Sequence, residues 1–195
     1  MKKKTRSVVI VLAMVLLSLA LISCASAPLS KSEKEQQQDS VRDMANATLT
    51  QLYAKNPAAK SEIAKAAGYA VFSDFGFKVI WLGGAGGSGI AVNNATKQET
   101  FMKMVEFQPG LGLGAAKFRL VFVFETPEAF NSFVTSGWEA GANAMASAKT
   151  KTEGGALAGA VSVSKGVKMF QLNDEGAIVG VSLTGAKYYK DKELN

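Results

Sequence analysis

The feature that most constrains the fold of this chain is the run Leu111–Glu125, which has the composition of a β-strand. The five residues before Glu125 are all apolar, in the order LVFVF. Because successive side chains of a strand point to opposite faces, such a run presents apolar groups on both faces of its sheet. The run therefore predicts a central strand, with other elements packed on each side.

Further strands are predicted by short apolar or β-branched runs that glycines and turn residues separate. They are Tyr69–Ser73, Phe77–Leu82, Gly87–Val92, Glu99–Phe107, Ala160–Ser164, Val167–Leu172 and Ala177–Leu183. Asn93–Thr96 has the composition of a turn. We interpret the glycines among the first runs as bulges and tight bends of a strongly curved sheet.

Two helices are predicted before the strands. Apolar residues between Val41 and Tyr53 recur with the 3.6-residue period of one helix face. Asn56-Pro57 then breaks the pattern and starts a second helix, with the asparagine as cap and the proline in the first position. Gly68 is its predicted end. We expect these apolar faces in the core; the alternative is a helix that lies on a membrane surface.

A long third helix is predicted to begin at Thr126-Pro127-Glu128, which supplies a capping hydroxyl, a proline and an acid near the positive end of the helix dipole. Its apolar stripe covers 130–145 and includes Trp138, for which we expect a core position. Gly137 and Gly141 would lie inside this helix, and each would destabilise it by about 1 kcal/mol relative to alanine. We interpret them as points of close packing on the sheet.

The predicted fold is therefore an α+β domain: a curled, mainly antiparallel sheet with an N-terminal helical pair and one long helix packed on it. This domain covers residues 40–195. Residues 24–39 are polar and of mixed charge, which predicts a flexible tether. The alternative for 32–40 is that they extend the first helix.

The amino terminus has the layout of an export signal. Its basic residues are Lys2, Lys3, Lys4 and Arg6, and the apolar run Val8–Ile22 follows. This run suits a signal peptide, whereas a membrane-spanning helix needs about 17–25 residues. Leu21-Ile22-Ser23-Cys24 resembles the lipobox of bacterial lipoproteins. Residues 1–23 are thus predicted to be a lipoprotein signal peptide; the alternative is an ordinary signal or an uncleaved anchor that contains a cysteine.

Cys24 is the only cysteine of the chain, so an intramolecular disulfide cannot form. The lipobox resemblance implies that its thiol is lipidated, and each buried CH₂ of acyl chains such as palmitate adds about 0.8 kcal/mol to the anchor. Ala25 and Ser26 follow, with no aspartate at the second position. By resemblance to the sorting rule of Gram-negative lipoproteins, we expect a cell-envelope protein anchored in the outer membrane and facing the periplasm.

The charge of the chain argues against a nucleic-acid partner. The net charge is +6, but four positive residues and no acid lie in 1–23, and their removal leaves +2. Nucleic-acid binding needs a concentrated basic face, and the remaining sequence has none.

Catalytic candidates are few. The chain has no histidine and its single thiol is the predicted lipidation site, which excludes His-based triads, a cysteine nucleophile and His-rich metal sites. Gly84–Gly89 matches G-x-G-x-x-G, but the following residues read as a strand end and a turn instead of the helix that dinucleotide binding requires. We expect a non-catalytic protein without a cofactor.

Four segments in order resemble the SYLF-domain family, which is named for lipid binding. They are Gly68–Phe72, the glycine run Gly83–Gly89, Phe133–Gly141 with SGWEAG at its centre, and Ser164-Lys165-Gly166. The resemblance covers roughly residues 40–190 and implies an anionic phospholipid or a membrane surface as partner. The chain departs from the family in the apolar segment Gly76–Leu82 and in lacking a strongly basic N-terminal helix.

On this resemblance we expect an apolar groove with lysines at its rim. The candidates are Lys149, Lys151, Lys165 and Lys168, each worth about 1 kcal/mol near an anionic surface. Lys165 is the first candidate among them because it belongs to the Ser-Lys-Gly segment of the resemblance. The alternative is an envelope scaffold that binds a protein partner through a sheet edge or an apolar patch at Phe77–Trp81. A closed apolar cavity would favour lipid, and a flat apolar patch would favour a protein.

Overall fold

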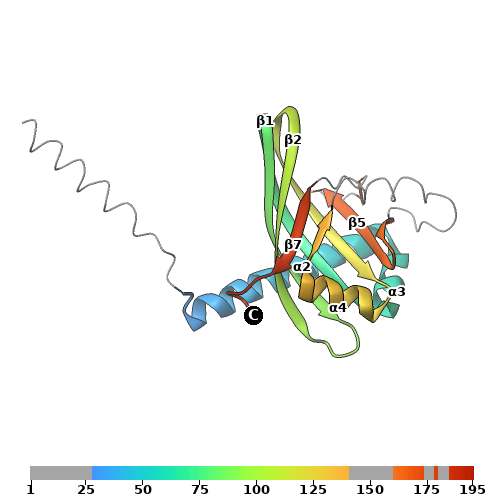
Figure 1. Ribbon diagram of the computed structural model, residues 1–195. Coiled ribbons are helices and arrows are strands. Elements are labelled where there is room, and N and C mark those ends of the chain that lie inside the picture. The colour runs from blue at the N-terminus through green and yellow to red at the C-terminus, as the bar shows by residue number, and fades with distance from the viewer. Residues whose placement is uncertain (1–27, 141–159, 174–177, 180–184) are drawn as a thin grey trace, which may run out of the picture. The chain divides into compact units, whose positions relative to one another are not determined.

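The largest part of the sheet is a single long antiparallel hairpin, which Figure 1 shows and which consists of β1 (Gly68–Asn93) and β2 (Glu99–Phe124). The computed structural model describes residues 28–140, 160–173, 178–179 and 185–195. The two strands pair along their whole length, with one register shift between Ile80 and Leu82. The predicted turn at Asn93–Thr96 joins them, and the side chain of Asn93 accepts hydrogen bonds from two backbone N–H groups within it.

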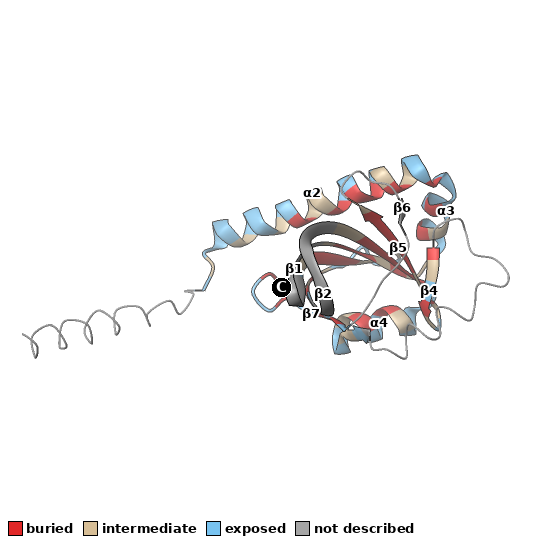
Figure 2. Cartoon of the chain, turned by 90° about the horizontal axis from the view of Figure 1, so that it is seen from above, coloured by how far each residue is buried: buried red, intermediate tan, exposed pale blue. Residues whose placement is uncertain are grey.

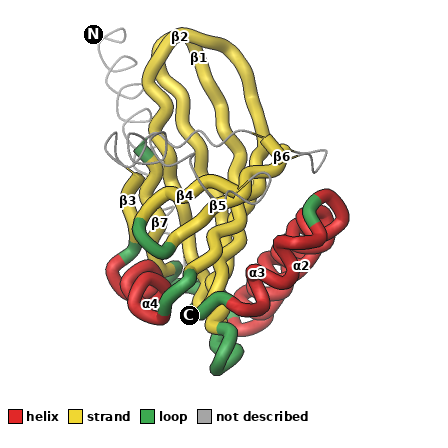
Figure 3. Tube along the Cα trace, turned by 90° about the vertical axis from the view of Figure 1, so that its right-hand side faces the viewer, coloured by secondary structure: helices red, strands yellow, loops and turns green. Residues whose placement is uncertain are grey.

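The prediction of several short strands in this region is wrong in one respect. The runs 69–73, 77–82 and 87–92 are parts of one strand, β1, and the runs 99–107 and 111–125 likewise join in β2. The glycines do not end the strands, because the partner strand keeps their backbone groups paired. The bends that the glycines predict are present: the hairpin doubles over near its middle (Figure 3), and a Cβ at Gly89 would collide with the ring of Phe72 in the same strand.

The remaining strands extend this hairpin into a seven-stranded antiparallel sheet with the order β3-β7-β2-β5-β4, in which β1 also pairs with β2 and β6 with β5. Their bounds are β3 Trp138–Ala140, β4 Ala160–Ser164, β5 Val167–Asn173, β6 Ile178–Val179 and β7 Ala186–Lys190. The α+β class and the curled antiparallel sheet are thus confirmed. The predicted last strand, 177–183, is described only at β6.

The central position of β2 is confirmed, and it is covered on both faces as predicted. Its first half pairs with β7 and its second half with β5. Phe122 and Phe124 point into the main hydrophobic cluster on one face. Val121 and Val123 are equally buried but lie outside that cluster. On their face Arg119 donates a hydrogen bond to Gln51 of the first helix, which identifies the element that covers it.

The N-terminal helical pair consists of α2 (Lys31–Lys55) and α3 (Pro57–Lys65), with Pro57 in the first turn as predicted. The buried residues of α2 are Val41, Ala45, Thr48, Leu49 and Leu52, so the predicted stripe faces the sheet (Figure 2). Because α2 begins at Lys31, the tether prediction is wrong for 31–39. The prediction that Gly68 ends the second helix is also wrong: α3 ends before it, and Gly68 begins β1 against the ring of Phe130.

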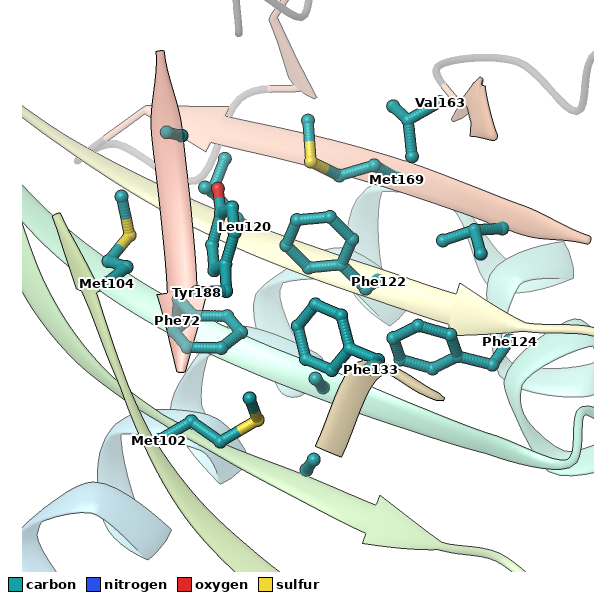
Figure 4. Packing of buried hydrophobic residues seen from close by; sticks show 14 of the residues in the cluster. Phe72, Met102, Met104, Leu120, Phe122, Phe124, Phe133, Val163, Met169 and Tyr188 are labelled. Carbon is teal, nitrogen blue, oxygen red and sulfur yellow. The ribbon is translucent and has the colours of Figure 1, made fainter. Parts of the chain in front are cut away.

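The core on the other face of β2 is built from aromatic rings (Figure 4). The ring of Phe122 lies 5.9 Å from Phe72, 5.6 Å from Phe133 and 5.0 Å from Tyr188, mostly edge to face. Such pairs add about 0.5–1.5 kcal/mol each beyond the burial of apolar area. This cluster holds the two halves of the bent hairpin, β7 and the third helix together.

The third helix, α4 (Pro127–Ser136), packs on the sheet but is shorter than its predicted stripe. Gly137 ends it with a φ of 74°, a conformation that glycine adopts without strain. The chain then enters β3, which pairs with β7. The prediction that Gly137 and Trp138 lie inside one long helix is therefore wrong, and Gly141 lies outside the described residues.

All of the described core lies within the compact unit Ser32–Asn195, so we expect this unit to fold without the residues before it. Hydrogen bonds hold its C-terminal end against α2 and β2. Gln38 donates to the carbonyl of Leu194, and the side chain of Asn195 accepts from the N–H of Phe101 and donates to its carbonyl. Among the described residues, no helix is long and apolar enough to cross a membrane.

Candidate functional site

A hollow of about 200 Å³ lies between α4, the β4–β5 turn and the start of β3. Its lining residues are Phe124, Ala129, Ser132, Phe133, Gly137, Trp138, Ser164, Lys165 and Val167. Ser132 and Lys165 are exposed, so the hollow opens to the surface, whereas the lining residues Phe124 and Phe133 are buried and form its floor. Figure 4 shows these two side chains within the core. The site is thus neither the closed cavity nor the flat patch that the two functional alternatives predict.

The first wall is the helix α4, whose start is fixed by its sequence. The Thr126 hydroxyl accepts a hydrogen bond from the Ala129 N–H at 3.2 Å, and Pro127 occupies the first turn. This confirms the predicted helix start. The spacing of a helix then places Ala129, Ser132 and Phe133 on one side, because residues three and four apart share a face. That side is the one that lines the hollow.

The second wall is the β4–β5 turn, Ser164-Lys165-Gly166, which lies against the start of α4. The N–H of Glu125 donates to the carbonyl of Gly166 at 2.8 Å. Gly166 has a φ of 72°, and a Cβ there would lie 3.8 Å from Thr126. This contact fixes the turn, and with it the backbone from which the Lys165 side chain extends at the rim of the hollow.

The third wall is Trp138, which is half-buried in β3. Its ring lies 5.8 Å from Phe122 and 5.7 Å from Tyr188, so one part of it packs on the core as predicted. The hollow borders the ring as well. The glycine at position 137 allows the chain to place Trp138 here, because a Cβ at Gly137 would collide with the carbonyl oxygen of Tyr188.

The predicted lysines do not form one group. Lys165 lines the hollow and has no ion pair or hydrogen bond to any other described residue. Lys168 is three residues away in β5, and its ammonium group lies 2.7 Å from Glu62 and 2.9 Å from Glu125. The hydrogen bond that Lys168 donates to Glu62, together with its contact to Glu125, raises the pKa of Lys168. Lys149 and Lys151 lie outside the described residues.

The position of Lys168 gives a stability prediction for Lys168→Met. At neutral pH we expect the free energy of unfolding to fall by about 1–3 kcal/mol, because Glu62 would lose its partner in a largely buried place. The pKa of Lys168 is raised in the folded state, so its contribution is complete below the unfolded value of 10.5 and is lost as the pH rises through the folded value.

Urea unfolding of the parent and of Lys168→Met from pH 7 to above 10.5 measures this effect. The difference between the two proteins should shrink at the alkaline end, while Lys192→Met, a change of an exposed lysine in the C-terminal segment, should cost almost nothing. Equal stability of parent and Lys168→Met at pH 7 would contradict the assignment.

Other sequence candidates are less informative. Gly84–Gly89 lies within β1, which continues to Asn93 and a turn, so this motif lacks the helix of a dinucleotide site. The side chains of the predicted patch Phe77–Trp81 lie outside what the structure describes. Among the described residues, Val105 and Tyr189 are the only large apolar side chains that are exposed. The described residues contain no group of three His, Cys, Asp or Glu side chains that could hold a metal ion.

Sequence reasoning missed much of the lining. Phe124 and Val167 were assigned only to strands, and Ser132 was not singled out. No local pattern marks them, because the hollow exists only where α4, the turn and β3 meet. The segments of the SYLF resemblance did contain a signal, because Phe133–Gly141 and Ser164–Gly166 are distant in the sequence. Phe133, Gly137 and Trp138 of the first segment and Ser164 and Lys165 of the second line one hollow.

Chemically, the hollow is suited to binding. Among the described lining residues, Lys165 alone has an ionisable side chain, and the other polar side-chain groups are the hydroxyls of Ser132 and Ser164 and the indole N–H of Trp138. Aromatic and aliphatic side chains make up most of the rest. Such a lining can hold an apolar group and attract an anion next to it.

Comparison with known proteins found a similar bacterial protein. No family model matches the chain. Over 160 residues, which are 79% of the chain, it is 33% identical to Beta cell expansion factor A of Aeromonas veronii. The matched stretch is 57% of that protein, so the chain spans little more than half the length of this relative. The chain is thus similar to part of a larger bacterial protein.

Proposed function

We propose that this protein is a non-catalytic lipid-binding lipoprotein of the bacterial cell envelope, with a SYLF-type domain that docks on anionic phospholipid membranes. The observation that carries the proposal is the hollow, which brings two segments of the SYLF resemblance together around apolar walls and places Lys165 at the rim. The lipobox ending at Cys24 supports an anchor in the outer membrane, which would keep the domain at a lipid surface.

The charges near the hollow support an anionic surface as the partner. Lys65, Lys97 and Lys165 are exposed and have no ion pair among the described residues. Backbone hydrogen bonds bring the segments that carry them to one end of the sheet: Ala67 to Phe124, Asn94 to Ala67, and Glu125 to Gly166. Glu62 and Glu125, which lie at the same end, are neutralised in part by Lys168.

Vesicle flotation with the soluble domain, residues 25–195, tests this proposal. We expect association with phosphatidylglycerol or cardiolipin vesicles and little with phosphatidylcholine. Lys165→Gln should weaken binding by about 1 kcal/mol, roughly fivefold, because each lysine near an anionic surface contributes that amount. High salt should remove most of this part, since the Debye length falls to about 3 Å at 1 M.

The matched control is Lys192→Gln, which removes the same charge from an exposed lysine in the C-terminal segment. It should bind as the parent does. Lys168→Gln is not a suitable probe of the surface, because it also breaks the contacts with Glu62 and Glu125. If the domain associates with no vesicle of any composition and carries no lipid after purification, the envelope scaffold that binds a protein partner becomes the better account.

A further inference from the structure

We infer that the hollow binds one single-chain amphiphile with an anionic head, its chain beside the half-buried Trp138 and over the buried floor of Phe124 and Phe133, and its head at Lys165. This inference rests on the proposed lipid-binding function and names the ligand of the same site. The class meant is a fatty acid or another monoacyl anion, as distinct from a diacyl phospholipid.

The volume of the hollow limits the apolar part of the ligand. Pockets that enclose a drug-sized molecule measure about 300–1,000 Å³. The hollow measures about 200 Å³ and is therefore too small for the two chains of a phospholipid. It can hold a segment of one chain. Its floor is apolar and closely packed, because Phe124 and Phe133 are each at most 4% exposed and their ring centroids lie 4.8 Å apart.

The position of the charge limits the head. Lys165 belongs to the same small hollow as the apolar floor, so the anion and the chain have to meet at one rim. In a monoacyl anion the charge is at the end of the chain itself. In a diacyl phospholipid, glycerol and ester groups separate the phosphate from the chains. Because Lys165 and the apolar floor line one hollow of only about 200 Å³, the site favours the monoacyl anion.

Charge complementarity selects an anion over a cation or a neutral head. Of the residues that the structure describes, only Lys165 brings a charged side chain to the lining, and no described carboxylate pairs with it. Ser132 and Ser164 add hydroxyls that can donate hydrogen bonds to carboxylate or phosphate oxygens. A quaternary ammonium head at this rim would meet the like charge of Lys165, and no carboxylate of the described lining would balance it.

Fluorescence of Trp138 tests the inference directly. The chain has two tryptophans, so Trp81→Phe leaves Trp138 as the sole reporter. In residues 25–195 with this change, a bromine-labelled fatty acid below its micelle concentration should quench Trp138 in a saturable way. Dodecanoate and dodecyl phosphate should compete with the probe, and their comparison separates a carboxylate from a phosphate head. Dodecyltrimethylammonium should not compete.

Two variants locate the ligand. Lys165→Gln should weaken dodecanoate binding about tenfold, because a hydrogen bond to a charged group is worth about 1.5–3 kcal/mol, and Lys165→Arg should restore most of it. Ala129→Phe should fill the hollow and abolish quenching; circular dichroism checks that this variant is folded. Lys192→Gln serves as the matched control and should leave binding unchanged.

The inference is overturned if dodecyltrimethylammonium competes as well as dodecanoate, or if Ala129→Phe still binds the bromine-labelled probe with parental affinity. Absence of quenching by any monoacyl probe also overturns it. These results leave the proposed function intact if the same protein still floats with phosphatidylglycerol vesicles. Loss of flotation together with retained dodecanoate binding would instead contradict membrane docking and keep the ligand assignment.

Discussion

Gly137→Ala is expected to lower the free energy of unfolding by more than 3 kcal/mol. Two costs add at this position. The backbone has φ 74° and ψ −174°, a region that is essentially reserved for glycine and costs other residues about 1–3 kcal/mol. In addition, the new Cβ would collide with the carbonyl oxygen of Tyr188, a backbone atom of β7 that cannot turn away as a flexible side chain can. Thermal and urea unfolding measure the loss.

Gly166→Ala is the matched control for this experiment. Gly166 also has a positive φ, 72°, but a Cβ there would lie 3.8 Å from its nearest neighbour, an ordinary contact. We expect a loss of about 1–2 kcal/mol, the cost of the left-handed conformation alone. If Gly137→Ala were no more harmful than Gly166→Ala, the close approach of β3 to β7 would be wrong, and the long uninterrupted helix would again be the better description.

The end of the helix at Gly137 is a feature that the sequence alone did not predict. The neighbours of this glycine continue an apolar stripe with helical spacing, so the local pattern predicts a helix that passes through it. The helix ends at Gly137, which takes a positive φ and lies against the backbone of Tyr188 in β7, a strand that was not predicted. Because the contact joins distant segments, it could not be read from the residues around either one.

Elements were predictable from the sequence where their own residues determine how they are buried or where they begin. The LVFVF run of β2 is apolar on both faces, and it is buried on both faces. Thr126-Pro127 starts α4 because capping is a matter of adjacent residues. Where burial depends on partners, the local pattern says less. Val105 is apolar and yet 46% exposed, whereas Met102 and Met104 of the same strand are buried in the cluster that contains Tyr188.

The candidate site shows the same division. Lys165 and Lys168 have similar sequence surroundings, and both were selected as cations at a rim. The structure separates them, because the two carboxylates that hold Lys168 come from α3 and from the end of β2, and neither is near it in the sequence. The hollow is likewise a tertiary feature, and its presence at two of the resembling segments is the new information that the fold provides.

Cys24→Ser is expected to have the largest effect on where the protein resides. The change replaces the thiol, the nucleophile that takes a diacylglycerol as a thioether, with a hydroxyl of far lower nucleophilicity. The lipid anchor should then be lost completely, and the precursor should persist or be misplaced. Metabolic labelling with a radioactive fatty acid, followed by separation of membrane and soluble fractions, measures both outcomes.

Ser23→Ala is the matched control, because it keeps a small residue before the cysteine and leaves the thiol in place. It should be labelled and anchored like the parent. The loss in Cys24→Ser should be nearly all-or-none: stable attachment needs two or more acyl chains, and each CH₂ contributes about 0.8 kcal/mol. The described domain offers no helix that could replace this anchor. Fatty-acid label that persists on Cys24→Ser would show that the lipid is attached elsewhere and would remove the basis for an outer-membrane location.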